Sequence, residues 1–513
     1  MTSRRSSSHH SVSLSLTFIG LLAFSLYLHY VMVPYADDDA YIHMRIASNL
    51  WHAGLPYFNK GEVVMASTSP LWVLLIAPFA TLLESQPLGV ALLNAFILVG
   101  ATLVWALFYL QTAHPRHARE ICVAAIVLFF TLAPSSIGLM ETPLALLLVG
   151  WGLLGIARGS VMGVPFLCAS MFARPECAVF AVCGVVWKIA RNQPWSAREI
   201  VVSGAVLASL SWFQFHFFGE LYPHTARAKE IVYSLTGSEF VRLLFIGSYG
   251  GWVAKIVVPP VILGAVVMAV VLTLRQKRVS FETLVREARS SPFLVILLPA
   301  VVILAVYGMK RVLIFPWYAP LYLVPLHLAL VRDSFRATGR IRLLAITLLI
   351  PCFATALCVV LGSRNFAYMP FFESGARARK LRHLGEWLAL EHANAKVAAP
   401  EIGALGFSFP GPIEDTVGLA SPGVLRFHPL KVPSQRPTGY HGGVPAAFIE
   451  ERRPDIVIGL DVLMTDFSNS PVASRYEIRK VSPVLEEDRA RLGTAKVFGA
   501  DALIIAIRKG DQS

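Results

Sequence analysis

Apolar stretches long enough to cross a bilayer as helices recur from residue 13 to residue 362, separated by short polar segments. Because backbone polar groups in lipid must be satisfied within each segment, this pattern predicts a polytopic α-helical membrane protein with about eleven transmembrane helices. The expected spans are 13–33, 88–110, 121–134, 143–157, 160–173, 176–190, 199–217, 252–274, 293–308, 316–331 and 341–362.

The apolar segment at 71–83 is shorter than a span, and its placement decides the topology. Under the positive-inside rule, short loops rich in Arg and Lys lie in the cytoplasm. If 71–83 crossed the membrane, every later basic loop would face outward, so the segment is interpreted as a juxtamembrane helix on the surface. Residues 1–12 then form a cytoplasmic tail, and residues 35–87 form a long first outer loop. The basic positions are Arg4, Arg5, Arg116, Arg119, Lys188, Arg191, Arg198, Arg275, Lys277, Arg278, Arg286, Arg289, Arg332, Arg336, Arg340 and Arg342.

The pattern changes after the last span. Residues 363–513 have the size of one ordinary soluble domain, and the topology places them outside the cell membrane. A helix is expected near 376–392, and short β-like runs at 396–399, 455–459 and 502–507 are separated by turns rich in Gly and Pro. The sequence therefore predicts a C-terminal extracytoplasmic α/β domain.

Composition agrees with this interpretation and narrows the function. Hydrophobic residues make up 55% of the 513 residues and charged residues 15%, fewer charges than soluble proteins carry. The net charge of +13 lies in the short basic loops and not on one face of a soluble domain, so no nucleic-acid partner is expected. The six cysteines show no metal-ligand or disulfide spacing.

The candidate chemistry begins with three consecutive acids, Asp37, Asp38 and Asp39, directly after the first span. If the residues that follow are helical, Arg45 and Asn49 share one face by i, i+4 spacing and form a polar ridge. A single acid at the end of a span is most often simply solvated. Three acids, a polar ridge and a long outer loop together favour a catalytic site at the membrane surface.

Three features of the first outer loop match a known family: Asp-Asp-Ala-Tyr-Ile at 38–42, the pair Arg45 and Asn49, and Thr-Ser-Pro-Leu-Trp at 68–72. Together they resemble the GT-C glycosyltransferases, in the branch similar to the mycobacterial terminal arabinofuranosyltransferase. Further matches follow in the family's order: Gly-Leu-Met-Glu-Thr at 138–142 with one extra Met, Arg-Pro-Glu at 174–176, the segment 218–225 with Lys229 and with His224 in place of Asn, and 402–406 and 415–419. Each motif alone is weak, but their shared order is fairly specific.

The resemblance implies inverting transfer of a sugar from a polyprenyl-phosphate donor. One carboxylate would take the proton of the acceptor hydroxyl as that hydroxyl attacks the anomeric carbon. Asp38 is the leading candidate for this base, with Asp39 orienting the acceptor or holding a metal, and Asp37 as a bystander or alternate. The choice among the three stays open. A pair of neighbouring buried carboxylates would raise one pKa, which suits a base that works near neutrality.

The departing phosphate requires positive charge. The candidate phosphate-binding residues are Arg45, His224, Lys229 and Arg311, each of which could equally anchor the protein at the lipid headgroups. The supporting residues are Asp37, Asn49, Glu141, Arg174 and Glu176. Glu141 would bind a metal or fix an Arg, whereas Arg174 and Glu176 are expected to form a structural ion pair in an outer hairpin.

The predicted function is transfer of a sugar, with arabinofuranose as one candidate, to a cell-envelope glycan, a lipid-linked saccharide or a surface protein. The site would lie on the outer side of the bacterial inner (plasma) membrane, where membrane lipids surround the polyprenyl donor. The sequence identifies no cofactor with certainty, a divalent metal stays open, and the C-terminal domain is interpreted as an acceptor-recognition lid. The alternatives are a polytopic transporter or flippase and a non-catalytic envelope assembly protein. Transporters place ionisable groups at mid-membrane, whereas these gather at one face.

Overall fold

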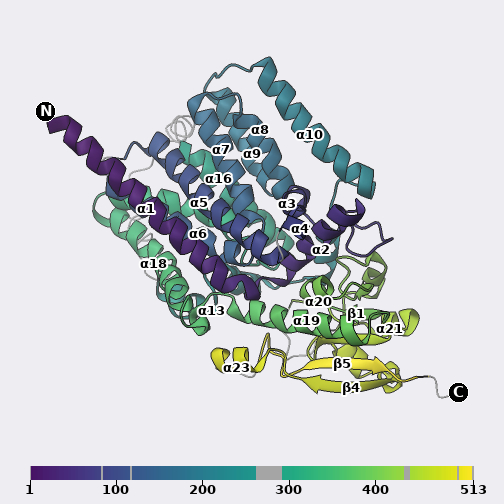
Figure 1. The fold of residues 1–513 in the computed structure, drawn as a ribbon. Helices are drawn as coiled ribbons and strands as arrows, with labels where there is room; N and C mark the ends of the chain where they lie inside the picture. The colour runs from purple at the N-terminus through teal and green to yellow at the C-terminus, as the bar shows by residue number, and fades with distance from the viewer. Residues whose placement is uncertain are drawn as a thin grey trace.

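A helical bundle and a sheet-containing C-terminal domain make up the chain, as seen in a computed structural model that describes residues 2–82, 85–115, 118–261, 292–431, 439–493 and 496–510 (Figure 1). The bundle helices are α1 (Thr2–Met32), α5 (Gln86–Ala113), α6 (Ala118–Ile137), α7 (Thr142–Arg158), α8 (Gly163–Ala173), α9 (Cys177–Ala190), α10 (Ala197–Phe218), α16 (Pro292–Lys310), α17 (Pro320–Arg336) and α18 (Gly339–Gly362). The predicted fold class, a polytopic helical protein with a C-terminal α/β domain, is confirmed.

The bundle agrees with most expected spans, although their number stays a prediction. Within the described ranges, six helices are long and apolar enough to cross a membrane, namely α1, α5, α6, α10, α16 and α18, and α7, α8 and α9 are shorter apolar helices. α1 begins at Thr2, so the expected tail continues this helix. Most of the expected span 252–274, the basic loop that follows it and Arg116 lie outside the described residues.

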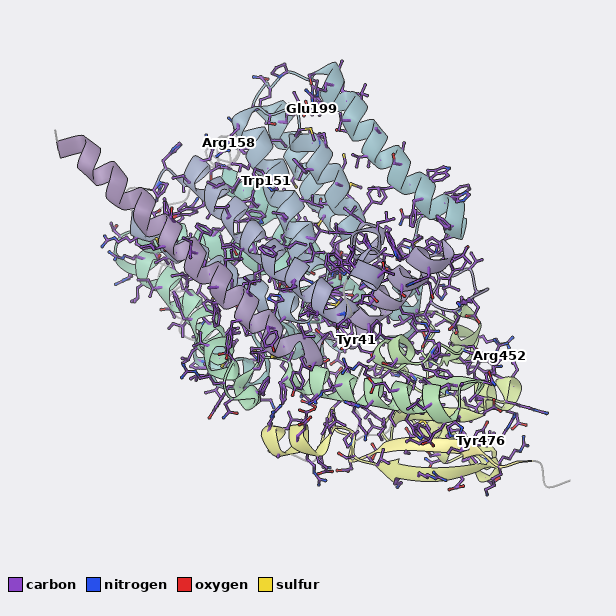
Figure 2. The ribbon with its side chains drawn as sticks, in the orientation of Figure 1. Tyr41, Trp151, Arg158, Glu199, Arg452 and Tyr476 are labelled. Atoms are coloured by element: carbon purple, nitrogen blue, oxygen red, sulfur yellow. The ribbon has the colours of Figure 1, made fainter. Side chains whose placement is uncertain are left out.

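The turns of the bundle follow from local sequence. Ser196 caps α10 by accepting a hydrogen bond from the Glu199 backbone, and α10 ends at Gly219, whose positive φ of 69° suits glycine. Arg158 on α7 and Glu199 on α10 lie at the end of the bundle remote from the sheet that carries Tyr476 (Figure 2). Glu199, which pairs with Lys188 at 3.1 Å, thus lies at the opposite end of the molecule from the sheet, and the predicted topology stays a prediction.

The first outer loop folds into η1 (Val33–Tyr35), α2 (Asp38–Ala53), α3 (Pro70–Ile76) and α4 (Phe79–Leu82). The last two correspond to the segment expected to be one helix on the surface. It is instead broken into two helices. The first of them, α3, packs into the protein, where it contacts α2, α8 and α10 and where Trp72 is fully buried. The apolar side chains of this segment therefore face protein on at least one side.

The second long connection carries α11 (His224–Val232), α12 (Gly237–Tyr249) and α13 (Gly251–Ile256). A capping box between Thr236 and Glu239 begins α12. α11 places His224 and Lys229 close to the C-terminal domain and to α2, respectively, as described below.

The C-terminal domain is built on a five-stranded mixed sheet of order β2-β1-β3-β5-β4. Its strands are β1 (Val397–Ala399), β2 (Ile413–Asp415), β3 (Ile456–Leu460), β4 (Tyr476–Val481) and β5 (Leu503–Arg508). β1 runs parallel to β2 and β3, whereas β5 is antiparallel to β3 and β4. The edge strand β4 exposes charged side chains, which disfavours pairing with another chain. The expected strands at β1, β3 and β5 are present, and β2 and β4 were not anticipated.

The C-terminal domain also contains helices, some of which pack between the sheet and the bundle. They are α19 (Phe372–Glu391), α20 (Gly403–Ser408), α21 (Ala446–Arg452), α22 (Thr465–Ser468) and α23 (Glu486–Leu492), with η2 (Phe366–Tyr368), η3 (Pro422–Phe427) and η4 (Pro471–Arg475). α19 lies between the bundle and the sheet, and it packs on α20, which in turn contacts α2 (Figure 1). Tyr41 on α2 marks this junction in Figure 2, and its ring packs against Phe407. The beginning of α2 therefore lies at the boundary of the two parts.

Candidate active site

The three consecutive acids face three different environments, because α2 begins within them. Asp37 precedes the helix and is buried; its backbone N–H donates to the Gly138 carbonyl at 3.2 Å. A side chain at Gly138 would place its Cβ 2.2 Å from the Asp37 carboxylate, so that carboxylate would have to move. Asp37 is thus packed against the loop at residues 138–142 and does not line the cavity described below.

Asp38 joins α2 to the C-terminal domain. Its two carboxylate oxygens accept hydrogen bonds from the backbone N–H groups of Gly403 at 3.0 Å and Ala404 at 2.8 Å, at the start of α20. Burial raises the pKa of Asp38, and the bond from Ala404 opposes that rise. Both oxygens are therefore occupied in holding the first outer loop against α20.

Asp39 points into a cavity and faces a cation. Its Oδ2 lies 3.9 Å from Nζ of Lys229 on α11, and that ammonium donates to the Tyr318 hydroxyl at 3.1 Å. Burial alone would lower the pKa of Lys229, but Tyr318 and Asp39 raise it above its usual value, so the ammonium stays charged. Asp39 is the one acid of the three that lines the cavity.

The cavity is partly open to solvent and has about 380 Å³ of space, part of it solvent, between α2, residues 138–142, α11 and the segment before α17. Its lining combines charged groups with aromatic side chains: Asp39, Ile42, His43, Ala66, Thr68, Met140, Glu141, Arg174, Thr225, Lys229, Trp317, Tyr318 and Leu419. Leu419 comes from the C-terminal domain, so both parts of the chain contribute to this cavity.

An ion-pair network forms one wall. Arg174 contacts Glu141 at 2.6 Å and Glu176 at 2.7 Å, and its guanidinium lies over the Tyr318 ring. Burial opposes ionisation of Glu141, but the adjacent Arg174 lowers the pKa of that carboxyl to about 2. Since two carboxylates flank one guanidinium, Arg174 brings little uncompensated positive charge to the cavity.

Besides Asp37, Asp38 and Glu176, three further predicted residues lie outside the cavity. Arg45 is buried beneath the C-terminal domain, where its guanidinium donates to Asn59 and to the carbonyls of Phe58, Gly406, Phe409 and Gly411. Asn49 donates to the carbonyls of Tyr57 and Phe58 and so holds the first loop. Arg311 is exposed beyond the end of α16, with a positive φ of 51°. Neither Arg45 nor Arg311 lines the cavity that contains Asp39.

His224, the remaining predicted phosphate ligand, contacts the C-terminal domain. Its Nε2 lies 2.9 Å from the Gly418 carbonyl, and burial lowers the pKa of the ring. The cavity thus brings together Asp39, Lys229, Glu141 and Arg174 from the sequence-based set. It adds His43, which follows Asp39 by one helical turn and could have been found from that spacing. Among the described residues, no group of three or more His, Cys, Asp and Glu is placed to hold a metal ion.

The buried Asp37 predicts a pH-dependent stability. Burial raises its pKa from 3.8 to about 7, Ser374 partly offsets this, and Asp39 adds to it. The folded state therefore retains a proton that the unfolded chain releases, and the free energy of unfolding falls as the pH rises from about 4 to 7. Thermal unfolding in detergent should show Asp37→Asn gaining stability over the wild type between pH 5 and pH 8. The pKa of Glu401 is also raised to about 7, but Glu401 is present in both proteins, so its contribution cancels in the difference between their stabilities. A difference that does not vary with pH would contradict the assignment.

Comparison with known proteins finds similarity in sequence over part of the chain. A family model described as a domain of unknown function (DUF8728) matches residues 371–498. The chain is 28% identical over 284 residues to a terminal β-(1→2)-arabinofuranosyltransferase of Corynebacterium glutamicum, covering 48% of this chain and 41% of that protein. It is 25% identical over 349 residues to the terminal β-(1→2)-arabinofuranosyltransferase of Mycobacterium tuberculosis, covering 59% and 54%. The matches thus span about half the length of these curated relatives.

The fold has a match over nearly the whole chain. ArnT from Cupriavidus metallidurans, whose crystal structure is bound to undecaprenyl phosphate, has a TM-score of 0.51 with this chain at 11% identity, covering 97% of this chain and 98% of that one. At this identity the likeness shows the fold alone. The chain therefore has the GT-C fold of ArnT, and over part of its length it is similar in sequence to the terminal arabinofuranosyltransferases.

Proposed function

We propose that the protein is a membrane glycosyltransferase that moves arabinofuranose from a polyprenyl-phosphate donor to a cell-envelope glycan. The observation that carries this proposal is the cavity in which the Asp39 carboxylate faces the Lys229 ammonium at 3.9 Å. The names of the two curated relatives support arabinofuranose as the sugar. The undecaprenyl phosphate bound by ArnT supports a polyprenyl-phosphate donor.

Asp39 is the base in this proposal, in place of the Asp38 that the family resemblance favours. Both oxygens of Asp38 accept backbone hydrogen bonds from α20, whereas Asp39 faces the cavity. As the acceptor hydroxyl attacks the anomeric carbon, Asp39 takes its proton. The bond from that carbon to the phosphate oxygen breaks, and the phosphate leaves with the electron pair on the opposite side of the sugar.

Lys229 stabilises the departing phosphate. Arg174, which also lines the cavity, is held by two carboxylates at hydrogen-bond distance. The Lys229 ammonium is 3.9 Å from Asp39 and so has no carboxylate partner at that distance. When the donor phosphate binds Lys229, it competes with Asp39 for this cation. Because attack and departure take place on opposite faces of the sugar, donor binding must separate Lys229 from Asp39, which leaves Asp39 free to accept a proton.

The aromatic wall supports a lipid-linked donor. Trp317 stacks on Phe315 with ring centroids 4.7 Å apart, and Tyr318 lies beside both, directly before α17. Aromatic residues at the ends of membrane helices prefer the level of the lipid headgroups. A polyprenyl phosphate whose chain lies in the bilayer would present its phosphate at this level.

The C-terminal domain contributes to the wall of the cavity, which supports its predicted role as an acceptor-recognition lid. The turn after β2 carries Leu419 into the cavity. Asp415 holds this turn by accepting the N–H groups of Val417 at 2.8 Å and Ala420 at 2.7 Å. His224 adds a contact from α11 to the same turn. An acceptor that approaches from outside would therefore meet this turn before it reaches Asp39.

The proposal is tested with the purified protein in proteoliposomes, supplied with radiolabelled polyprenyl-phosphate arabinofuranose and an arabinan oligosaccharide. Labelled oligosaccharide with inverted anomeric configuration is expected. Movement of the donor across the bilayer without acceptor and without product would favour a flippase instead.

Replacing Lys229 with Met should slow transfer by roughly 10²-fold or more, because the leaving phosphate loses its cation. The matched controls are Lys310→Met and Arg311→Met, since Lys310 is exposed and paired with Glu230 and Arg311 is exposed outside the cavity. Steady-state kinetics with varied donor should show the loss in Lys229→Met and near-normal values in both controls. A larger loss in Arg311→Met would instead support the sequence-based choice of Arg311 as a phosphate ligand.

A further inference from the structure

A chain of hydrogen bonds fixes the orientation of His43 in the cavity wall. The Ser69 backbone N–H donates to Oγ of Ser67 at 3.1 Å, and the same Oγ lies 3.0 Å from Nδ1 of His43. We assign the Ser67 hydroxyl as the donor to Nδ1, because the Nε2 side of the ring faces the Glu141 carboxylate, which favours a proton on Nε2. The neutral ring then carries its proton on Nε2.

That Nε2–H faces a carboxylate oxygen without a partner. Oε2 of Glu141 lies 3.6 Å from Nε2, which is longer than a hydrogen bond, and it has no hydrogen-bond partner among the described residues. The other oxygen of Glu141 is held by Arg174 at 2.6 Å, and the side chain is only 1% exposed. Leaving a buried, ionised acceptor unpaired is costly. His43 and Glu141 both line the cavity, so a ligand there lies against both side chains.

We propose that His43 and Glu141 together bind one hydroxyl group of a sugar in the cavity. The hydroxyl oxygen accepts from Nε2–H of His43, and the hydroxyl hydrogen is donated to Oε2 of Glu141. This inference rests on the proposed function and names the sugar hydroxyl that the same cavity recognises. His43 is one helical turn from Asp39, so the bound hydroxyl belongs to a sugar within reach of the base, either the transferred sugar or the acceptor.

The chemistry of the pair selects a hydroxyl over other groups. A hydroxyl combines one donor with acceptor lone pairs, which matches a fixed N–H beside an unpaired carboxylate oxygen. A phosphate would be repelled by Glu141, whose low pKa keeps it ionised. A site built to bind a hydroxyl rejects an analogue that lacks it, because its own buried polar groups are then left unpaired.

Deoxy analogues give the test, in the transfer assay described above. One series lacks single hydroxyls of the donor arabinofuranose, and a second lacks single hydroxyls of the terminal acceptor residue. In the wild type, one compound should fall in kcat/KM on the order of 100-fold below its parent. If that compound is a donor analogue, the pair binds the transferred sugar; if it is an acceptor analogue, the pair binds the acceptor. In His43→Phe the parent and that compound should react at nearly equal rates.

Two serine variants separate this role from a purely structural one. Ser67→Ala removes the hydroxyl that orients His43 and should shrink the discrimination. Ser69→Ala is the matched control, because the Ser69 hydroxyl is equally buried and has no hydrogen-bond partner among the described residues, so discrimination should persist. Equal rates across both series in the wild type, or discrimination that survives in His43→Phe, would overturn this inference alone. Absence of any product from the parent compounds would overturn the proposed function and this inference with it.

Discussion

Asp39→Asn is expected to slow sugar transfer by roughly 10²- to 10⁴-fold, the range that a general base contributes. The carboxamide has nearly the same shape as the carboxylate but cannot take the acceptor's proton. Its loss of charge also removes the 3.9 Å ion pair with Lys229, so donor binding should hold or strengthen. Single-turnover assays should therefore show a large fall in rate at unchanged or lower donor KM.

Asp38→Asn is the matched comparison. The amide can still accept one of the two backbone hydrogen bonds from α20, but its NH2 group cannot accept the other. We expect a lower unfolding temperature and a smaller loss of rate than in Asp39→Asn. If Asp38→Asn were inactive and well folded while Asp39→Asn kept its rate, the base would be Asp38, as the family motif indicates.

Gly403→Ala is expected to detach the C-terminal domain from α2. A Cβ at this position would lie 1.8 Å from the backbone oxygen of Asp38 and 2.9 Å from its Cγ, so α2 and α20 would have to separate. Overpacking of this kind typically costs about 1–3 kcal/mol, and here it also disrupts both hydrogen bonds to the Asp38 carboxylate. Transfer should fall strongly because the Leu419 wall of the cavity moves with the domain.

Limited proteolysis and thermal unfolding measure this effect. Cleavage between the bundle and the C-terminal domain should be faster in Gly403→Ala than in the wild type. Gly423→Ala is the control in the same domain, because a Cβ there meets no atom within 4 Å. Identical proteolysis and activity in Gly403→Ala and Gly423→Ala would mean that contact between α2 and α20 does not organise the site.

The helical class and the region of the site could be predicted from the sequence. Apolar periodicity identified the bundle, and the three acids with Lys229 and Glu141 were found from motif order. The distribution of roles among the acids was not predictable, because it depends on α20, more than 360 positions away in the chain. One residue's difference along α2 decides whether a carboxylate meets that helix or the cavity.

The same limit explains why the contacts of Arg45 and the strands β2 and β4 were not predicted. The i, i+4 ridge correctly placed Arg45 and Asn49 on one helix face, but tertiary contacts direct Arg45 to carbonyls of the C-terminal domain. β2 has only three residues and β4 is mostly exposed, so neither shows the apolar run that marks β3 and β5. Local patterns identify elements, whereas these contacts arise between distant segments.

The C-terminal domain is therefore part of the site and more than an appended module. Asp38, Arg45 and His224 each contact it from the membrane part of the chain, and it returns Leu419 to the cavity. The residues matched by the family model of unknown function, 371–498, include all of these docking points on the domain side. This position supports the proposed role of that domain in acceptor recognition.

The most direct measurement is an experimental structure of the protein bound to a polyprenyl-phosphonate arabinofuranose, a donor analogue that cannot release its sugar. Our account predicts the phosphonate in contact with Lys229 and the sugar between Asp39 and the His43–Glu141 pair, with the lipid chain leaving beside Trp317. A phosphonate bound elsewhere, for example at Arg311 outside the cavity, would contradict it.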